Sequence, residues 1–320
     1  MGAGYGFAGH IGFAKEASGG TPVAATDYIE ALSEGLSLAP DRFETKNIIG
    51  RFSEAQDESG VNRIAGPIVF PAMPNELGFF LLGATGIQSN TVVLSGFLHT
   101  HEFTMRTADW DSVFASNPFT FEIFRDVTSS QQYAGCNISR LEMSMAPNQD
   151  LRVSAQLIGK STLNLQATTP TFTSSPASPF TFDTASIQLP AGTATAQMEA
   201  FSLTIDNQLQ GIPSLNNSKN IRAIRRTGPQ MIRFSGTLAF ENITEYLNFT
   251  NQTKQRIVAS FTKANSFSMA IDLPQFNYRT FPLGMGGRDR QTISFEGAAE
   301  YNAGSGTAIK VSVTNTRSGY

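Results

Sequence analysis

A short series of motifs occurs twice along this chain of 320 residues, in the same order. Arg63, Gly66 and Phe70 recur as Arg233, Gly236 and Phe240, an offset of 170 residues, and apolar residues follow at equivalent places between them. The matched segments are 36–38 with 201–203, 45–48 with 218–221, and 63–70 with 233–240. Ordered matches at a nearly constant spacing indicate a duplicated module, because internal repeats are how such architectures show in a sequence.

The repeat predicts two modules joined by a polar linker rich in proline and hydroxyl residues. The glycine-rich start of the chain predicts a flexible arm ahead of the first module. The predicted divisions are the arm at 1–9, module 1 at 10–167, the linker at 168–178 and module 2 at 179–320.

Short runs with an apolar side chain at every second residue dominate the chain, which is typical of half-buried strands. These runs are 36–38, 91–97, 141–145, 151–157, 201–205, 232–240 and 309–313. The prediction is a mainly β chain with two tandem sandwich or barrel modules, each with a short flanking α-helix and a long loop.

Two segments have helical spacing instead, one in each module. Residues 74–82 begin with a proline and carry a compact apolar face. Residues 241–249 place Ile243, Tyr246 and Leu247 at helical spacing, with Asn242 as the expected N-cap.

Charge and cysteine content narrow the function classes. The net charge of −3 argues against a protein that holds nucleic acid through phosphate contacts. A single cysteine, Cys136, excludes an internal disulfide and fits a reducing compartment. The sequence has no apolar run long enough to span a membrane and no signal peptide, which predicts an intracellular origin.

The sequence offers little for catalysis. His99 and His101 would share one face of a strand, but His10 is the only other histidine, so two surface histidines are expected rather than a metal site. The glycines at 4–9 match a dinucleotide fingerprint only as text, because no strand precedes them. Trp110, between two aspartates, fits a strand or turn. No enzyme, cofactor or metal is predicted.

Several segments resemble bacteriophage tail tube proteins of long flexible, non-contractile tails. The resemblance rests on Gly12-Phe13-Ala14-Lys15-Glu16 with Gly20-Thr21-Pro22-Val23, on the stretch from Ala65 to Gly83, and on the strand-turn from Phe201 to Asn207. It covers nearly the whole chain in order, although its motifs are loose.

This resemblance implies a virion tail protein assembled in the host cytoplasm. In that family six β-sandwich modules form a ring, neighbouring strands join into one inner barrel, and a long loop reaches the next ring. The partners it implies are copies of the same chain, the tape measure protein and double-stranded DNA in the lumen without specific binding, and the tail terminator and tail tip proteins. No membrane partner is implied.

Two modules per chain predict that three chains supply the six modules of a ring. The two long loops, expected after Leu38 and after Ile205, carry opposite charges and are the candidate contacts between modules or rings. Their residues are Lys46, Glu54, Asp57 and Glu58 in the first loop and Lys219, Arg222, Arg225 and Arg226 in the second. Two solvated loops that contribute little remain the alternative.

Other functions remain open from the sequence. A terminator or baseplate ring would share the virion setting, and a β-rich adhesin or carbohydrate-binding module is a different class. The single Trp and the lack of an export signal argue against the adhesin.

Overall fold

The computed structural model describes residues 4–44, 57–94, 97–105, 118–166, 170, 172, 178–193, 195, 197–263, 267–284 and 290–320. Lys46, Glu54, Trp110 and most of the predicted linker lie outside these residues. The fold is mainly β, as the alternating runs predict, and each run overlaps a strand.

The elements of the first part of the chain surround one buried helix. They are η1 (Gly6–Ala8), β1 (His10–Lys15), β2 (Asp27–Ile29), β3 (Ser33–Glu34), β4 (Ser37–Glu44), β5 (Asp57–Pro71), α1 (Leu77–Thr85), β6 (Gly86–Leu94), β7 (Leu98–Met105), β8 (Phe119–Phe124), β9 (Ser129–Met145), β10 (Arg152–Gly159) and β11 (Ser161–Gln166).

The second part carries a second, exposed helix. Its elements are η2 (Phe182–Thr184), β12 (Ala185–Gln188), β13 (Met198–Asp206), β14 (Leu209–Ile212), β15 (Ala223–Arg226), β16 (Met231–Ala239), α3 (Thr244–Thr250), β17 (Gln255–Thr262), β18 (Ser268–Thr280), β19 (Thr292–Ala299) and β20 (Lys310–Asn315).

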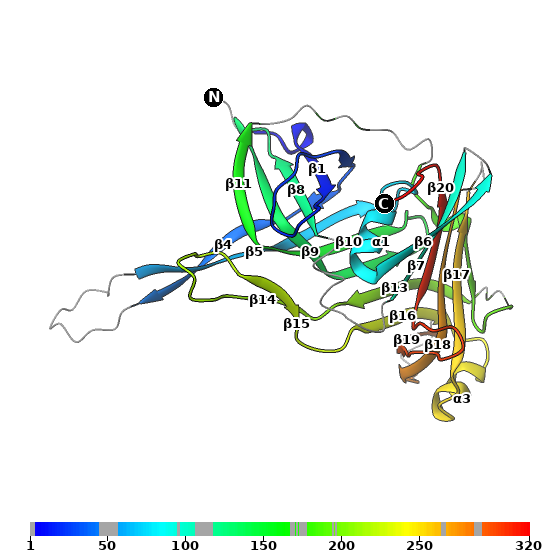
Figure 1. Ribbon diagram of the computed structural model, residues 1–320. Helices are drawn as coiled ribbons and strands as arrows, with labels where there is room; N and C mark the ends of the chain where they lie inside the picture. The colour runs from blue at the N-terminus through cyan, green and yellow to red at the C-terminus, as the bar shows by residue number, and fades with distance from the viewer. Residues whose placement is uncertain are drawn as a thin grey trace.

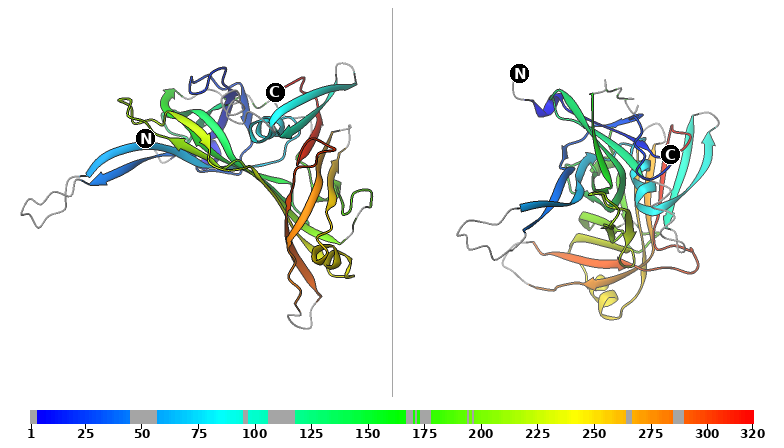
Figure 2. Two further views of the ribbon diagram at one scale, coloured as in Figure 1. Left: turned by 60° about the horizontal axis from the view of Figure 1, so that its bottom comes forward. Right: turned by 60° about the vertical axis from the view of Figure 1, so that its left-hand side comes forward.

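One sheet runs through both parts and is called the long sheet below. Its strand order is β4–β5–β10–β9–β13–β16–β19–β18, with every neighbouring pair antiparallel. At one end β4 and β5 project from the body as a hairpin (Figure 2). The segment expected as a loop after Leu38 is therefore a strand as far as Glu44, because it pairs with β5.

The order of strand pairing occurs twice. In the first part the pairing runs β1–β8–β9–β10–β5–β4, and in the second it runs β12–β17–β18–β19–β16–β13. Leu38 pairs with Ile64, and Leu203 pairs with Phe234, which are positions that the sequence comparison matched. The β6–β7 hairpin follows α1 but has no counterpart after α3.

Strands β9 and β18 each belong to two layers. The first part of β9 pairs with β8 and β11, and its second part pairs with β10 and β13. The first part of β18 pairs with β17 and β20, and its last residues pair with β19. Both strands have a register irregularity at this change, near Ser139 in β9 and Arg279 in β18. Figure 1 shows the outer strands standing on one side of the long sheet.

Phenylalanines fill the space between the layers. Phe13, Phe79, Phe80 and Phe121 are buried, and the Phe13 ring centroid lies 5.0 Å from that of Phe79. Around the second part Phe201, Phe234, Phe276 and Phe295 are likewise buried, and the first two rings stack at 5.8 Å. Such rings contribute large apolar area without a polar group to satisfy.

Helix α1 begins three residues later than the spacing predicts and ends at Thr85, where Gly86 caps it with a φ of +93° that suits glycine. The preceding turn is tied to the C-terminal segment instead, because Asn315 Nδ2 donates to Pro74 O at 2.7 Å. Every residue of α1 is buried, and Tyr320 packs against its Gly78. In Figure 1 the C-terminus lies beside α1.

Helix α3 begins at Thr244, also three residues later than expected. The Asn242 side chain accepts a hydrogen bond from the Thr244 N–H at 3.0 Å. Asn242 therefore satisfies a helix N–H as predicted, although Ile243 holds the N-cap position.

The backbone of β5 at Gly66 passes very close to the backbone of Gly35 and Leu36, and this close crossing gives a stability prediction. A Cβ there would lie 2.1 Å from the Gly35 carbonyl oxygen, so the backbone of β5 or of its neighbour would have to move. Gly66→Ala should lower the free energy of unfolding by about 1–3 kcal/mol, measured by denaturation of unassembled protein. Gly6→Ala is the control, because nothing lies within 4 Å of that added Cβ. Equal stability of both variants would contradict the crossing.

Glu76 gives a pH prediction. Its side chain is buried at 8% exposure, and burial raises its pKa from 4.5 to about 7, although Arg317 opposes the rise. The folded state then holds the proton more tightly than the unfolded state. The contribution of Glu76 to stability should be greatest below pH 4.5 and fall as the pH rises to about 7, by roughly 3 kcal/mol.

Denaturation across this pH range checks the effect of Glu76. Glu76→Gln should remove the fall, because the amide does not ionise, whereas Glu58→Gln at an exposed site should keep it. An unchanged pH dependence in Glu76→Gln would show that other groups cause it.

Candidate functional site

The long sheet has one covered face and one polar face. Alternate residues of β13, Phe201, Leu203 and Ile205, point into the core, while Ser202 and Thr204 point the other way and are half-buried. Helix α1 and the outer strands cover the first face, so the second is the surface that the described residues leave open (Figure 1). The centre of this polar face, over β9, β13 and β16, is hollowed by a cavity of about 390 Å³.

Each arginine on the polar face lies within ion-pair distance of a carboxylate. The pairs, by nitrogen–oxygen distance, are Arg63–Asp41 at 2.8 Å, Arg140–Glu142 at 3.2 Å, Arg152–Asp150 at 3.8 Å and Arg233–Glu296 at 2.8 Å. The hydrogen bonds from Arg63 hold the pKa of Asp41 below its usual value. Such exposed pairs add little stability. Their effect is on the electrostatic potential of the polar face, because a carboxylate beside each arginine offsets its positive charge and no basic patch forms among the described residues.

The two sets of strands that share one pairing order, β4–β5–β10–β9 and β13–β16–β19–β18, meet in the middle of the long sheet. There β9 pairs with β13. Leu203 lies opposite Met143, and Ile205 lies opposite Leu141. All four side chains are fully buried at 0% exposure. The Asn207 N–H donates to Ser139 O at 2.8 Å and continues the ladder beyond β13. This junction is a tight strand-to-strand interface within one chain.

Asn207 fixes the end of this junction to α1. Its side chain is fully buried and donates to the carbonyl oxygens of Ala84 and Ile138 at 3.1 and 2.9 Å. Its Oδ1 accepts from Arg226 Nη2 at 2.9 Å and from Gln230 Nε2 at 2.6 Å. Arg226, a predicted loop contact, therefore helps to hold the junction within its own chain.

The hairpin and the second loop lie side by side. The Asn62 N–H donates to Lys219 O at 2.8 Å, and Asn62 Nδ2 donates to Asn220 Oδ1 at 3.0 Å. The predicted contact residues Asp57 and Glu58 begin β5, where Arg42 donates to Asp57 at 2.8 Å. The structure brings Lys219 next to β5 through the backbone hydrogen bond from Asn62.

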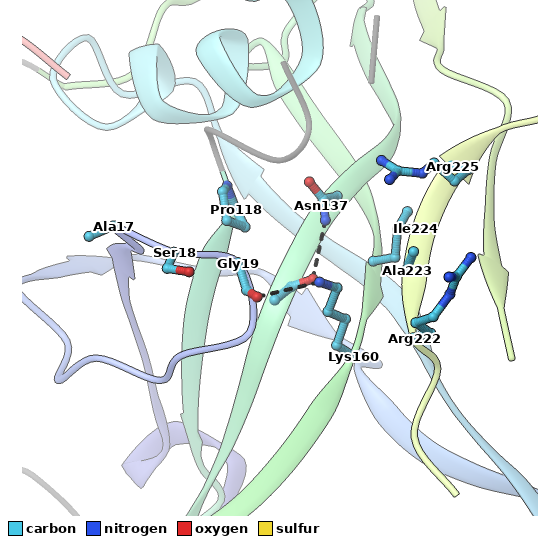
Figure 3. Close-up of a pocket in the computed structure, with 11 residues that line it drawn as sticks. Ala17, Ser18, Gly19, Pro118, Asn137, Lys160, Arg222, Ala223, Ile224 and Arg225 are labelled. Atoms are coloured by element: carbon cyan, nitrogen blue, oxygen red, sulfur yellow. Dashed lines mark hydrogen bonds between the residues drawn. The ribbon is translucent and has the colours of Figure 1, made fainter. Parts of the chain in front are cut away.

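Arg222, just before β15, and Arg225, within β15, are exposed and border a cavity of about 460 Å³. Figure 3 shows them on one side, with Asn137 and Lys160 facing them. Lys160 Nζ donates to Gly19 O at 3.3 Å. The lining holds cations and backbone but no acid–base pair, so its geometry suits a contact surface better than a reaction.

The histidine prediction is wrong in one respect, because His101 is buried rather than on the surface. Its ring bonds to Gln88 Nε2 at 2.8 Å and to the Arg317 carbonyl oxygen at 2.9 Å, while burial lowers its pKa. His99 lies on the same side at a ring distance of 6.2 Å. The side chain is buried because the C-terminal segment folds over β7.

Other chemical candidates take structural positions. Cys136 is fully buried, and burial raises the pKa of its thiol. In the described ranges no group of three or more potential metal ligands comes together. Over the same ranges no helix is long and apolar enough to cross a membrane. The Gly4–Gly9 segment contains η1, and Tyr5 N–H donates to Asp126 at 2.8 Å.

Sequence reasoning missed the polar face and Asn207. Arg140 and Glu142, two residues apart on one strand, were a signal for a shared face. The partners from other strands, such as Glu296 for Arg233, gave no signal because they are far apart in sequence.

The chain is thus a mainly β protein whose long sheet carries one covered face and one polar face. A sequence model of the family described as "Phage tail tube protein" matches residues 6–316. The chain belongs to this family of virion tail proteins, which are structural and self-assemble into a tube. No curated protein matches the chain.

Proposed function

We propose that three copies of this chain close into a ring of six modules, and that stacked rings form the tube through which the phage genome leaves the virion. The observation that carries this proposal is the strand order of the long sheet. Four strands, β4, β5, β10 and β9, are followed by four in the matching order, β13, β16, β19 and β18. Each chain thus supplies two equivalent units.

The duplication follows from the same comparison. The sequence repeat and the repeated pairing order support modules at 10–167 and 179–320, joined through 168–178. The modules also share strands, since β13 pairs with β9 and β20 pairs with β7. The pair therefore folds as one body, which suits a chain that contributes a fixed third of a ring.

The polar face of the long sheet is the surface proposed to line the channel. Its opposite face is covered by the core, so a barrel made of these sheets has only the polar face to turn inward. The paired arginines suit passage of duplex DNA, because an unpaired cation would add salt-dependent affinity for phosphate. The tape measure protein would meet the same face before the DNA.

The projecting β4–β5 hairpin is the proposed contact between rings (Figure 2). The proposed contact residues remain Lys46, Glu54, Asp57, Glu58, Lys219, Arg222, Arg225 and Arg226. Asn62 already holds the second loop against β5 within the chain. Among the arginines, Arg222 and Arg225 are exposed, whereas Arg226 also supports Asn207.

The wider partners follow from this role. The ends of the tube would meet the tail terminator and the tail tip proteins, in a long non-contractile tail that carries no sheath. A terminator or baseplate role would instead produce a single ring.

Electron microscopy of purified protein tests the proposed function. Tubes with a regular axial repeat and three chains per ring, with the mass checked by native mass spectrometry, are expected. Closed rings that never stack would favour a terminator or baseplate component. Six chains per ring would refute the stoichiometry.

The channel assignment predicts a specific effect of Glu296→Gln, which leaves Arg233 without its carboxylate. Tubes of this variant should retain short duplex DNA that is protected from DNase, and salt should release it. Wild-type tubes should retain none.

Glu102→Gln is the matched control, because Glu102 pairs with Lys310 away from the polar face and has similar exposure, 40% against 44%. Its tubes should hold no protected DNA. Equal retention by both variants would place the channel elsewhere.

A further inference from the structure

The long sheet ends in two strand edges that are unpaired within the described chain. At one end β4 pairs only with β5, and at the other residues 277–280 of β18 pair only with β19. Unpaired edges of this kind invite pairing with another strand. We propose that these two edges pair with each other between neighbouring chains, and that residues 281–284, which follow β18, extend its edge so that Leu38 lies opposite Leu283. This inference rests on the proposed ring and adds its residue register.

The template for this contact is the junction inside the chain. There β9 pairs with β13, and in the repeated pairing order β9 corresponds to β18 and β13 to β4. The last strand of the first four, β9, therefore already pairs with the first strand of the second four, β13, within each chain. Repeating the same contact between chains closes the sheet.

Two alignments set the register. Leu36-Ser37-Leu38 matches Phe201-Ser202-Leu203. The first segment lies beside β5 with its Gly66, and the second lies beside β16 with the matching Gly236. Segment 137–144 matches 277–284, since both begin with asparagine and carry their irregularity two residues later. Leu203 pairs with Met143 inside the chain, so the corresponding pair between chains is Leu38 with Leu283.

Exposure supports the same pair. Leu203 and Met143 are fully buried at 0%, whereas Leu38 and Leu283 are 38% and 44% exposed. A shift by two residues would place Leu38 opposite Phe281, which is already buried within its own chain at 5% exposure. Pairing the two exposed leucines removes both from water.

The backbone also fits this arrangement. The Gly35 N–H donates to Pro67 O at 2.8 Å, so in an antiparallel ladder Gly35, Ser37 and Ala39 bond toward β5. Leu38 then points its N–H and carbonyl oxygen outward, as Leu203 does toward β9. Pro282 corresponds to Glu142, whose backbone faces away from the junction, so its missing N–H costs no bond there.

The register predicts which cysteines can form a disulfide. Ser37 and Gly284 would be neighbours outside the hydrogen-bonded pairs, where Cα atoms lie about 4.5 Å apart. This separation is within the range of about 4.4–6.8 Å for disulfides. Both residues are exposed, and a Cβ on Gly284 meets nothing within 4 Å.

The test oxidises assembled Ser37→Cys/Gly284→Cys protein. Chains linked up to a trimer are expected on a non-reducing gel. Ala39→Cys/Gly284→Cys, which is shifted by two residues, is the matched control and should link poorly. The native Cys136 is buried and should not interfere.

A second variant tests the apolar contact. Leu38→Asp should raise the protein concentration needed for ring formation by about tenfold or more, because it places a charge against Leu283. Phe97→Asp is the control, since Phe97 is 70% exposed just before β7, a strand that is not part of the long sheet. Circular dichroism of the unassembled variants shows that both still fold.

The outcomes separate the register from the proposed function. If wild-type protein forms tubes but Ser37→Cys/Gly284→Cys does not link, or the shifted control links instead, the register is wrong and the tube stands. If wild-type protein forms neither rings nor tubes, the proposed function fails and the junction fails with it.

Discussion

Hydrogen bonding along strand edges is the constraint on which the rest of this structure depends. A strand edge exposes a row of N–H and carbonyl groups that must find water or another strand. The chain satisfies this demand internally where β9 meets β13, and the long sheet then continues from one unit into the next. The ends at β4 and β18 are under the same constraint, and the proposed pairing between neighbouring chains would satisfy it.

The two faces of the long sheet have different roles: one builds the core and the other forms a polar surface. Phenylalanines from both parts of the chain pack on one face and hold the outer strands and α1 against it. The other face carries short polar side chains and arginines held by carboxylates. Because side chains alternate along a strand, one set of strands supplies both a core and a polar surface.

Sequence patterns predicted much of the fold but little of the site. Alternating runs located strands because half-burial requires that pattern, and the repeat located matching strands in each half. Helix positions were displaced, since Pro74 and its neighbours bond to the C-terminal segment instead of starting α1. The predicted loop after Leu38 proved to be a strand. No alternating apolar pattern marked it in the sequence, because neither side of this projecting hairpin faces the core.

The sequence by itself determined the mainly β character, since this depends on the local spacing of apolar residues. Tertiary structure alone decided that His101 is buried, that Asn207 anchors the central junction and that each arginine of the polar face has a carboxylate partner. These features depend on strands far apart in sequence. The physical reason is that strand register sets which side chains become neighbours, and register is fixed only when the sheet forms.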